Sequence, residues 1–268
     1  MKTPITYYGG KQRLARKIVS LIPEHNLYAE PFCGGAAVFF TKEKSGVEVI
    51  NDTNKLLINF YRQVQNNFVD LEKEIRISLH SRDLFRKAKV IYANPDMFSE
   101  LKQAWAIWIM SQQSFCAKID GTWGYDISKK TTSRKIHNKR EAFTEEYAIR
   151  LQEVQIECTD AIRIITTRDR PTSFFYCDPP YYNSDCGHYD GYSLEDYERL
   201  LETLASIDGK FLLSSYPSAI LDKFKKKHGW FQYEEKSEVS VSRKKYERKV
   251  KTEVLTGNYD FTDLLNKE

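Results

Sequence analysis

Two consecutive prolines place the sharpest constraint on how this chain folds locally. Pro179 and Pro180 follow Asp178 and the apolar run at residues 174–177, which is typical of a buried strand. Because proline lacks an N–H group and fixes φ, the strand must end here in a stiff turn. The turn displays the Asp178 carboxylate, the Pro179 carbonyl and the flat ring of Tyr181. This set suits a planar ring with an exocyclic amine, such as adenine, although the same tetrapeptide also serves simply to end strands.

A second strand, turn and helix pattern stands near the N-terminus. A short apolar stretch ends in Glu30-Pro31-Phe32-Cys33-Gly34-Gly35, and a helical pattern follows at residues 36–40. This order opens a nucleotide-binding α/β unit. The glycines do not form G-x-G-x-x-G, which disfavours a dinucleotide site, and no Walker phosphate loop is present.

A further strand at residues 47–50 ends in Asn51-Asp52. A carboxylate at the tip of the second strand is where such folds hold ribose hydroxyls, so we expect Asp52 to bind ribose. The alternative is that Asp52 or Thr53 caps the next helix.

The alternation of strands and helices stops near residue 61 and resumes about ninety residues later, at the strand pattern of residues 154–157. Helical periodicity dominates the interval, which indicates an insertion. We therefore predict a catalytic domain formed by residues 1–60 and 151–268, with a mainly helical inserted domain at residues 61–150. Strand patterns at residues 230–235, 237–241 and 250–256 predict a terminal hairpin, and the fold class is α/β.

Composition excludes several classes of protein. The five cysteines are scattered and form no C-x-x-C pair, which argues against a disulfide framework and a zinc site, so we expect no metal. No stretch reaches the roughly 18 apolar residues of a membrane span, and the first residues lack the apolar core of a signal peptide. We expect a cytoplasmic protein without membrane contact.

The net charge of +4 is modest, but two runs are strongly basic. Such runs are commonly solvated surface, yet beside a nucleobase-shaped site they favour contacts with nucleic-acid phosphates. The predicted phosphate-binding residues are Lys129, Lys130, Arg134, Lys135, Lys139 and Arg140 in the first run, and Arg243, Lys244 and Lys245 in the second.

Three motifs in this order resemble one family. The segment Tyr7-Tyr8-Gly9-Gly10-Lys11, the segment at residues 28–35 and the Asp178-Pro179-Pro180-Tyr181 turn are similar to those of Dam-like DNA adenine-N6 methyltransferases of the D12 class, α-group. The resemblance implies a Rossmann-like methyltransferase sheet and S-adenosyl-L-methionine as cofactor. The residues it assigns to the cofactor are Tyr7, Lys11 with a free cationic head, Glu30, Pro31, Phe32, Gly34, Asp52 and Asp178.

The insertion resembles the target-recognition segment of these enzymes. An Asn-Arg-Thr-x-Phe-type stretch of the family stands near residues 112–115, although the arginine is absent here. Amide and hydroxyl side chains in a loop can meet base edges, so we expect Gln112, Gln113 and Ser114 to contact DNA, together with the aromatic residues at 121–125.

The resemblance implies a mechanism in which adenine is flipped out of double-stranded DNA. Asp178 and the Pro179 carbonyl accept the two N6 hydrogens, Pro180 stiffens the turn, and Tyr181 stacks on the base. Two alternatives stay open: a cytosine-N4 or protein-glutamine methyltransferase, and a nucleic-acid-binding protein without activity. We expect a monomer, and a cognate restriction endonuclease that acts independently is an open partner.

Overall fold

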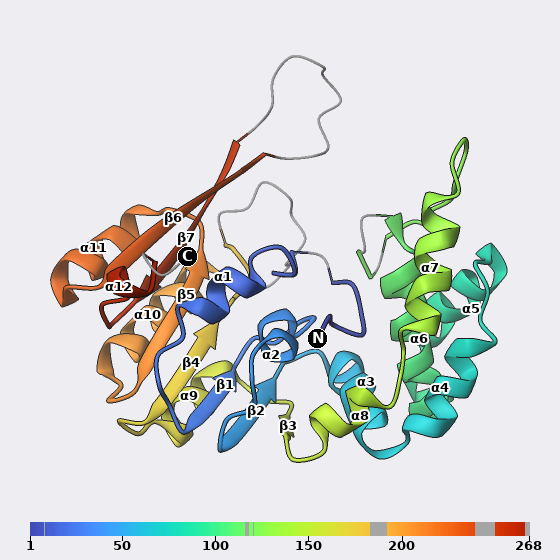
Figure 1. Cartoon of the computed structure of the whole chain (residues 1–268), viewed down its shortest axis with the longest axis horizontal. Helices are drawn as coiled ribbons and strands as arrows, with labels where there is room; N and C mark the ends of the chain where they lie inside the picture. The colour runs from blue at the N-terminus through green and yellow to red at the C-terminus, as the bar shows by residue number, and fades with distance from the viewer. Residues whose placement is uncertain (8, 116–117, 120, 183–191, 239–249, 266–268) are drawn as a thin grey trace. The chain divides into compact units, whose positions relative to one another are not determined.

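The computed structural model describes residues 1–7, 9–115, 118–119, 121–182, 192–238 and 250–265 (Figure 1). Its internal contacts divide the chain into two compact units. The first unit contains Met1–Val19, Cys33–Glu43 and Ile50–Thr159, and the second contains Ser20–Phe32, Lys44–Val49 and Asp160–Glu268. Each unit draws on segments that are far apart in the sequence.

The strands form a seven-stranded mixed sheet with the order β3-β2-β1-β4-β5-β7-β6. Their bounds are β1 Leu27–Glu30, β2 Val47–Asn51, β3 Gln155–Glu157, β4 Ser173–Cys177, β5 Lys210–Ser215, β6 Phe231–Glu238 and β7 Val250–Gly257. The strand order reverses between β1 and β4, which are parallel neighbours. In open α/β sheets, ligands bind outside the carboxyl ends of the strands at such a switch point. The predicted α/β, Rossmann-like fold is confirmed.

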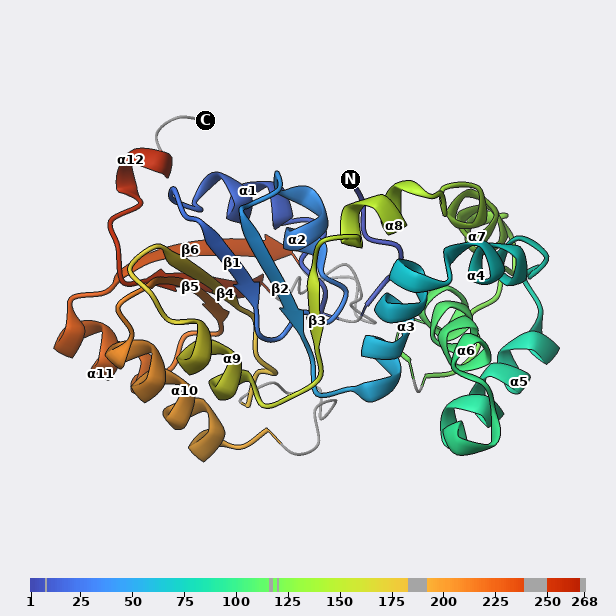
Figure 2. The same ribbon diagram turned by 90° about the horizontal axis from the view of Figure 1, so that it is seen from below.

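In the second unit, β4 is the central strand and all five of its residues are buried. It pairs in parallel with β1, where Tyr28 stands opposite Phe174, and with β5, where Phe175 stands opposite Phe211. Phe175 and Cys177 pack toward three helices that lie along one face of these strands (Figure 2). These helices are α9 Ala161–Arg168, α10 Leu194–Ser206 and α11 Ala219–His228. Burial on both faces explains the uninterrupted apolar run of β4.

The predicted terminal hairpin is confirmed as the antiparallel pair β6 and β7 (Figure 1). The two separate strands expected at residues 230–235 and 237–241 are one strand as far as Glu238, because its backbone pairing with β7 continues through Ser237. Residues 239–241 lie outside the described residues.

The first unit is mainly helical. It contains β3 and the end of β2, and its helices are most of α1 (Ala15–Ser20), α2 Ala37–Thr41, α3 Lys55–Asn66, α4 Phe68–Arg76, α5 Arg82–Ala93, the 3-10 turn η1 Pro95–Met97, α6 Glu100–Gln113, α7 Thr131–Glu141 and α8 Glu146–Leu151. Every residue of α6 from Ala104 onward is buried, so α6 is the central helix of this unit. The division of the sequence at residues 60 and 150 into catalytic and target-recognition domains stays a prediction. No helix of the described residues has the length and apolarity needed to cross a bilayer.

The helix α1 begins only at Ala15, four residues after Lys11. Two turns occupy the interval: the Gly10 N–H donates to the Tyr7 carbonyl at 3.0 Å, and the Leu14 N–H donates to the Lys11 carbonyl at 3.0 Å. Gly9 has φ 72°, a left-handed conformation that interrupts a helix. The described residues of the Tyr7 to Lys11 motif therefore lie in a turn that precedes the helix.

Candidate active site

The glycine turn after β1 lets the ring of Tyr7 pack closely against its backbone. Gly34 has φ 46°, and a Cβ atom there would lie 3.3 Å from the Tyr7 ring. A Cβ atom on Gly35 would lie 2.9 Å from the Tyr7 Cβ, closer than side chains tolerate. The Gly34 carbonyl accepts a hydrogen bond from the Tyr61 hydroxyl at 2.7 Å. Glycine is thus required at both positions for Tyr7 to lie against the turn.

Asp52 holds the same turn from the end of β2. Its Oδ2 atom accepts the Gly34 N–H at 3.0 Å, and its Oδ1 atom accepts the Asn54 N–H at 2.9 Å. Burial raises the pKa of Asp52, and the hydrogen bonds from Asn54 and Gly34 oppose that shift. Thr53 also donates a backbone hydrogen bond to this carboxylate, and three bonds still leave part of its roughly four lone-pair sites for a hydroxyl group.

The alternative capping role for Asp52 or Thr53 is wrong. Asn54 is the N-cap of α3, because its Oδ1 atom accepts the N–H groups of Leu56 and Leu57, each at 3.1 Å. The assignment of Asp52 to ribose stays a prediction.

Lys11 does not carry the free cationic head that the sequence pattern indicated. Its side chain is buried, with 7% of its surface exposed, and its Nζ atom donates to the Gly9 carbonyl at 3.4 Å. The buried amine lies on the turn that Tyr7 begins. Lys11 is therefore placed to stabilise this turn from within the first unit.

In the second unit, two carboxylates follow neighbouring strands at the switch point. Glu30 ends β1 and Asp178 follows β4. Glu30 is buried and accepts the hydroxyl of Tyr28 at 2.6 Å, and burial together with Glu30 raises the pKa of that tyrosine. Phe32, after Pro31, makes an edge contact with Tyr192 at a centroid distance of 6.2 Å. Carboxylates and aromatic rings thus collect at the carboxyl end of β1 and β4.

Hydrogen bonds to its hydroxyl group and one aromatic contact hold the ring of Tyr181, the last residue of the turn. Its hydroxyl group lies 3.3 Å from Asp178 Oδ1 and 3.1 Å from Ser214 Oγ, and it also bonds to Glu253. Tyr216 makes an edge contact with the ring at 4.4 Å. Burial, followed by the charges of Asp178 and Glu253, raises the pKa of Tyr181, so this hydroxyl keeps its proton.

Sequence reasoning missed Glu253 and Ser214. Glu253 lies in β7 and accepts the Ser214 hydroxyl at 3.2 Å in addition to its bond with Tyr181. An acidic residue inside an alternating strand pattern is the one signal that was available. Glu253 therefore adds a second carboxylate near the turn.

The first basic run divides into exposed and internal side chains. Lys129, Lys130, Arg134 and Lys135 are exposed. Lys139 Nζ donates to the Thr3 carbonyl at 3.1 Å, and burial together with Lys135 and Lys2 lowers the pKa of Lys139 to about 8. Arg140 donates twice to the Arg76 carbonyl, at 3.0 and 2.6 Å. The internal bonds of Lys139 and Arg140 identify them as structural links of the first unit.

A depression of about 440 Å³ opens beside α7 in the first unit. Among the described residues, no acidic side chain lines it, whereas five cationic side chains do: Lys2, Lys130, Arg134, Lys135 and Lys139. Asp126 is engaged at the start of α7, where its carboxylate accepts the N–H groups of Ser133 and Thr132. These two hydrogen bonds lower the pKa of Asp126. The depression has the charge needed for an anion such as a phosphate.

The sequence pattern indicated a loop at Gln112, Gln113 and Ser114, but these residues do not lie in one. The two glutamines form the last turn of α6 and Ser114 is its C-cap, and all three are buried. The glutamine amides bond within the protein. Direct contact of these residues with DNA stays a prediction, and it requires a conformation other than this one. Arg243, Lys244 and Lys245 lie outside the described residues.

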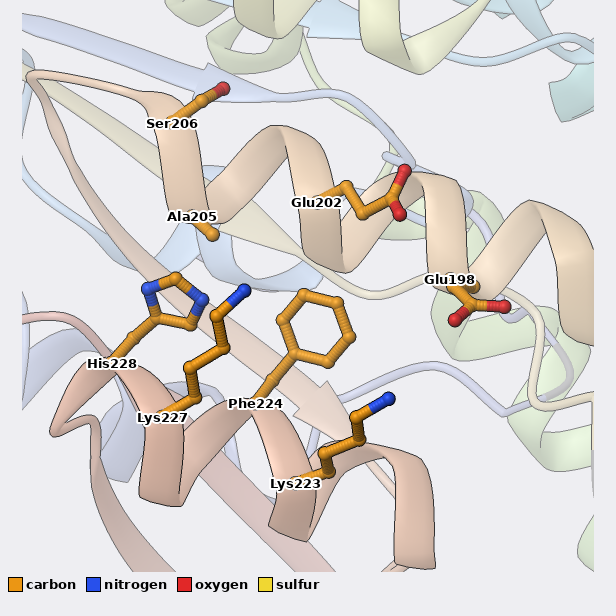
Figure 3. A pocket seen from close by; sticks show the side chains of 8 residues that line it. All are labelled: Glu198, Glu202, Ala205, Ser206, Lys223, Phe224, Lys227 and His228. Carbon is orange, nitrogen blue, oxygen red and sulfur yellow. The ribbon is translucent and has the colours of Figure 1, made fainter.

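One further pocket, of about 380 Å³, lies between α10 and α11 (Figure 3). Glu198 and Glu202 line its α10 side, whereas Lys223 and Lys227 line its α11 side. The opposed charges offset one another, so this pocket does not favour a phosphate. None of its residues belongs to the predicted site, and the described residues contain no group of three or more potential metal ligands.

The sheet order reverses between β1 and β4, with a glycine turn after one strand and Asp-Pro-Pro-Tyr after the other, which is the arrangement expected of an amino-methyltransferase. The family model described as D12 class N6 adenine-specific DNA methyltransferase matches residues 7–244. The chain belongs to this family, and it is a site-specific DNA methyltransferase that acts on N6 of adenine.

The chain is also similar to two known proteins. The Type II methyltransferase M1.LlaDCHI of Lactococcus lactis subsp. cremoris is 29% identical over 241 residues, which cover 80% of each chain. The structure of the rRNA methyltransferase aviRa from Streptomyces viridochromogenes matches with a TM-score of 0.34 and 12% identity, covering 95% of this chain and 86% of that one. The second likeness is too distant to bear on function.

Proposed function

We propose that the protein transfers a methyl group from S-adenosyl-L-methionine to N6 of an adenine that is flipped out of double-stranded DNA. The observation that carries this proposal is the Asp178 to Tyr181 turn at the switch point, where Tyr181 is held by Asp178, Ser214 and Glu253. A turn that is stiff by covalent structure and bonded at its end keeps its acceptors in place without reorganisation during the reaction.

The residues fit a cofactor that carries a ribose, an adenine ring and a sulfonium group. The first unit offers the Asp52 carboxylate with unused lone pairs and a turn at Gly34 that tolerates close approach. The second unit offers Glu30, Asp178 and the ring of Phe32. We assign to the cofactor Tyr7, Lys11, Glu30, Pro31, Phe32, Gly34, Asp52 and Asp178. The bound cofactor supplies a methyl group activated by the positive sulfonium.

The chain's own residues prepare the acceptor base. The adenine amino lone pair is delocalised into the ring and is a poor nucleophile. Asp178 and the Pro179 carbonyl each accept one N6 hydrogen, which favours a pyramidal nitrogen whose lone pair is available. Stacking on the Tyr181 ring offsets part of the cost of unstacking the base, which is a few kcal/mol.

DNA is held through the positively charged side chains of the two basic runs. We assign phosphate contacts to Lys129, Lys130, Arg134 and Lys135, and to Arg243, Lys244 and Lys245 of the second basic run. Residues 61–150 act as the target-recognition domain. A similar protein is a Type II methyltransferase, which supports a cognate restriction endonuclease that acts independently as the open partner. We also propose that the chain acts as a monomer.

The test of this function is a transfer assay with purified protein and radiolabelled S-adenosyl-L-methionine. Label is expected in duplex DNA and in its N6-methyladenine fraction after digestion. Label in N4-methylcytosine, in RNA or in protein would contradict the proposal, as would saturable DNA binding without any transfer.

Asp52→Ala is expected to weaken cofactor binding by about 1–3 kcal/mol, because a charge-assisted hydrogen bond to ribose is lost and the Gly34 turn loses its acceptor. Calorimetric titration of S-adenosyl-L-methionine measures the effect. Asp208→Ala, which removes an exposed carboxylate, is the control. Unchanged affinity for Asp52→Ala would leave this residue only its role in the turn.

Lys135→Ala is expected to weaken binding to cognate and scrambled duplexes alike and to lower the slope of log K against log salt by about one unit. The reason is that an exposed lysine in the basic depression neutralises a phosphate without reading sequence. Lys226→Ala, an exposed lysine of α11, is the matched control. Loss of cognate binding alone, with an unchanged slope, would contradict a phosphate contact.

A further inference from the structure

The first seven residues form a strap inside the first unit. The Thr3 hydroxyl donates to the Gly35 carbonyl at 2.5 Å, and Tyr7 lies against Gly34 and Gly35. The terminal amine of Met1 donates to the Phe40 carbonyl at 2.7 Å. The strap, residues 1–7, thus contacts both the glycine turn and the helix that follows it.

Gln112 holds the middle of this strap from the end of α6. Its Nε2 atom donates to the Pro4 carbonyl at 3.4 Å, and its Oε1 atom accepts the Thr6 hydroxyl at 3.2 Å. The side chain is 3% exposed, so water does not readily replace these bonds. Thr6 directly precedes Tyr7, and the amide therefore acts one residue from the ring that packs on the glycine turn.

Gln113, the next residue, faces a different segment. Its Oε1 atom accepts the Ser81 N–H at 3.1 Å and the Trp123 Nε1–H at 3.3 Å, and its Nε2 atom donates to the Leu79 carbonyl at 3.0 Å. Its own carbonyl accepts the Gly124 N–H at 2.8 Å. This glutamine is fully buried. It therefore ties the segment around Trp123 to the start of α5.

The segment that Gln113 holds carries an exposed stack of aromatic and cationic groups. Tyr125 stacks on Trp123 with a centroid distance of 5.6 Å and an angle of 16° between the rings, and Tyr125 is 57% exposed. The Arg82 guanidinium lies 4.7 Å from the centre of the Trp123 ring. Exposed aromatic and arginine side chains are among the groups that contact nucleic acids, through stacking and phosphate contacts.

We infer that the two adjacent glutamines are positioning residues with separate tasks: Gln112 positions the strap and Tyr7 for cofactor binding, and Gln113 positions residues 121–125 for DNA binding. The inference rests on the proposed function for the two ligands. It replaces a shared role as base readers with two roles that the hydrogen bonds of each side chain define. One helix end thereby anchors both the cofactor turn and the DNA-facing segment.

The test uses Gln112→Met and Gln113→Met in the full chain, since methionine keeps the volume and removes the hydrogen bonds. Gln112→Met is expected to raise the Kd for S-adenosyl-L-methionine about five- to tenfold without DNA, and to leave cofactor-free DNA binding within about twofold. Gln113→Met is expected to do the reverse, weakening DNA about five- to tenfold and sparing the cofactor. Each variant is the control for the other, because both lose buried hydrogen bonds of the same helix turn.

Steady-state kinetics separate the two roles, because a general loss of stability would not raise KM for one ligand in one variant and KM for the other ligand in the other. Gln112→Met is expected to raise KM for the cofactor and Gln113→Met to raise KM for DNA. Thr6→Val, which removes the hydroxyl that bonds to Gln112, should reproduce the Gln112→Met pattern and serves if that variant does not fold.

Equal losses of both ligands in both variants would overturn the inference, and so would a Gln112→Met protein that loses discrimination between cognate and scrambled DNA with normal cofactor affinity. The titration of the wild-type protein separates the failure of the proposed function from the failure of this inference. If the wild-type protein bound no S-adenosyl-L-methionine, the proposed function would be contradicted, whatever the two glutamine variants did.

Discussion

Asp178→Ala is expected to lower the rate of methyl transfer by about 10²–10³-fold or more, because one of the two acceptors for the N6 hydrogens is lost. Asp178 follows β4, whose five residues are all buried, so the strand keeps its core side chains when Asp178 is replaced. The protein should remain folded, and its affinity for DNA should stay close to that of the wild type. The measurement is single-turnover transfer of labelled methyl groups, accompanied by thermal unfolding and DNA titration.

Two further variants sharpen this test. Asp178→Asn keeps one acceptor oxygen and the size of the side chain, so its residual rate separates charge from hydrogen bonding. Asp222→Ala removes an exposed carboxylate of α11 that forms an ion pair with Lys225, and this control should transfer at the normal rate. Near-normal turnover of Asp178→Ala would remove this residue from the catalytic site.

Tyr181→Ala is expected to have the second largest effect, slowing transfer by about 5- to 150-fold, since base stacking on an aromatic ring is worth about 1–3 kcal/mol. Tyr181→Phe should retain most of the rate because the ring remains. The loss of its hydroxyl still leaves Glu253 bonded to Ser214. This pair of variants divides stacking from the hydrogen bonds that hold the ring.

Fluorescence of 2-aminopurine at the target position reports flipping directly. The signal should change when wild-type protein binds, and the complex with Tyr181→Ala should be brighter because quenching by the ring is removed. Equal rates for the alanine and phenylalanine variants would exclude stacking as the role of Tyr181. A target base that stays stacked in a complex with a cofactor analogue would exclude flipping.

Local sequence signals were sufficient for the parts of the site that lie on one segment. The apolar run before Asp178 predicted β4, and two prolines predicted the turn, because backbone geometry and the missing N–H groups act within a few residues. The glycine turn at Gly34 and the hairpin of β6 and β7 were predicted for the same reason. Each depends on spacing that is visible along the chain.

The contacts between distant segments were decided only by the tertiary structure. Glu253 bonds to Tyr181 across 72 positions, and Gln112 bonds to Pro4 across 108. A glutamine in a polar stretch has the same sequence signature whether it faces solvent or the interior, so Gln112 and Gln113 were expected to meet DNA and are instead buried.

The same limit explains Lys11 and Asp52. The sequence alone determined that a lysine follows a glycine turn and that a carboxylate follows a strand, which are properties of neighbouring residues. Whether the lysine amine is exposed, and which N–H groups the carboxylate accepts, depend on the segments that the fold brings against them. The buried Lys11 amine donates to the Gly9 carbonyl. Asp52 accepts the N–H group of Gly34, which is 18 positions away in the sequence, and Asn54 caps α3. Side-chain partners are chosen by packing and desolvation in three dimensions, and a one-dimensional pattern does not encode that competition.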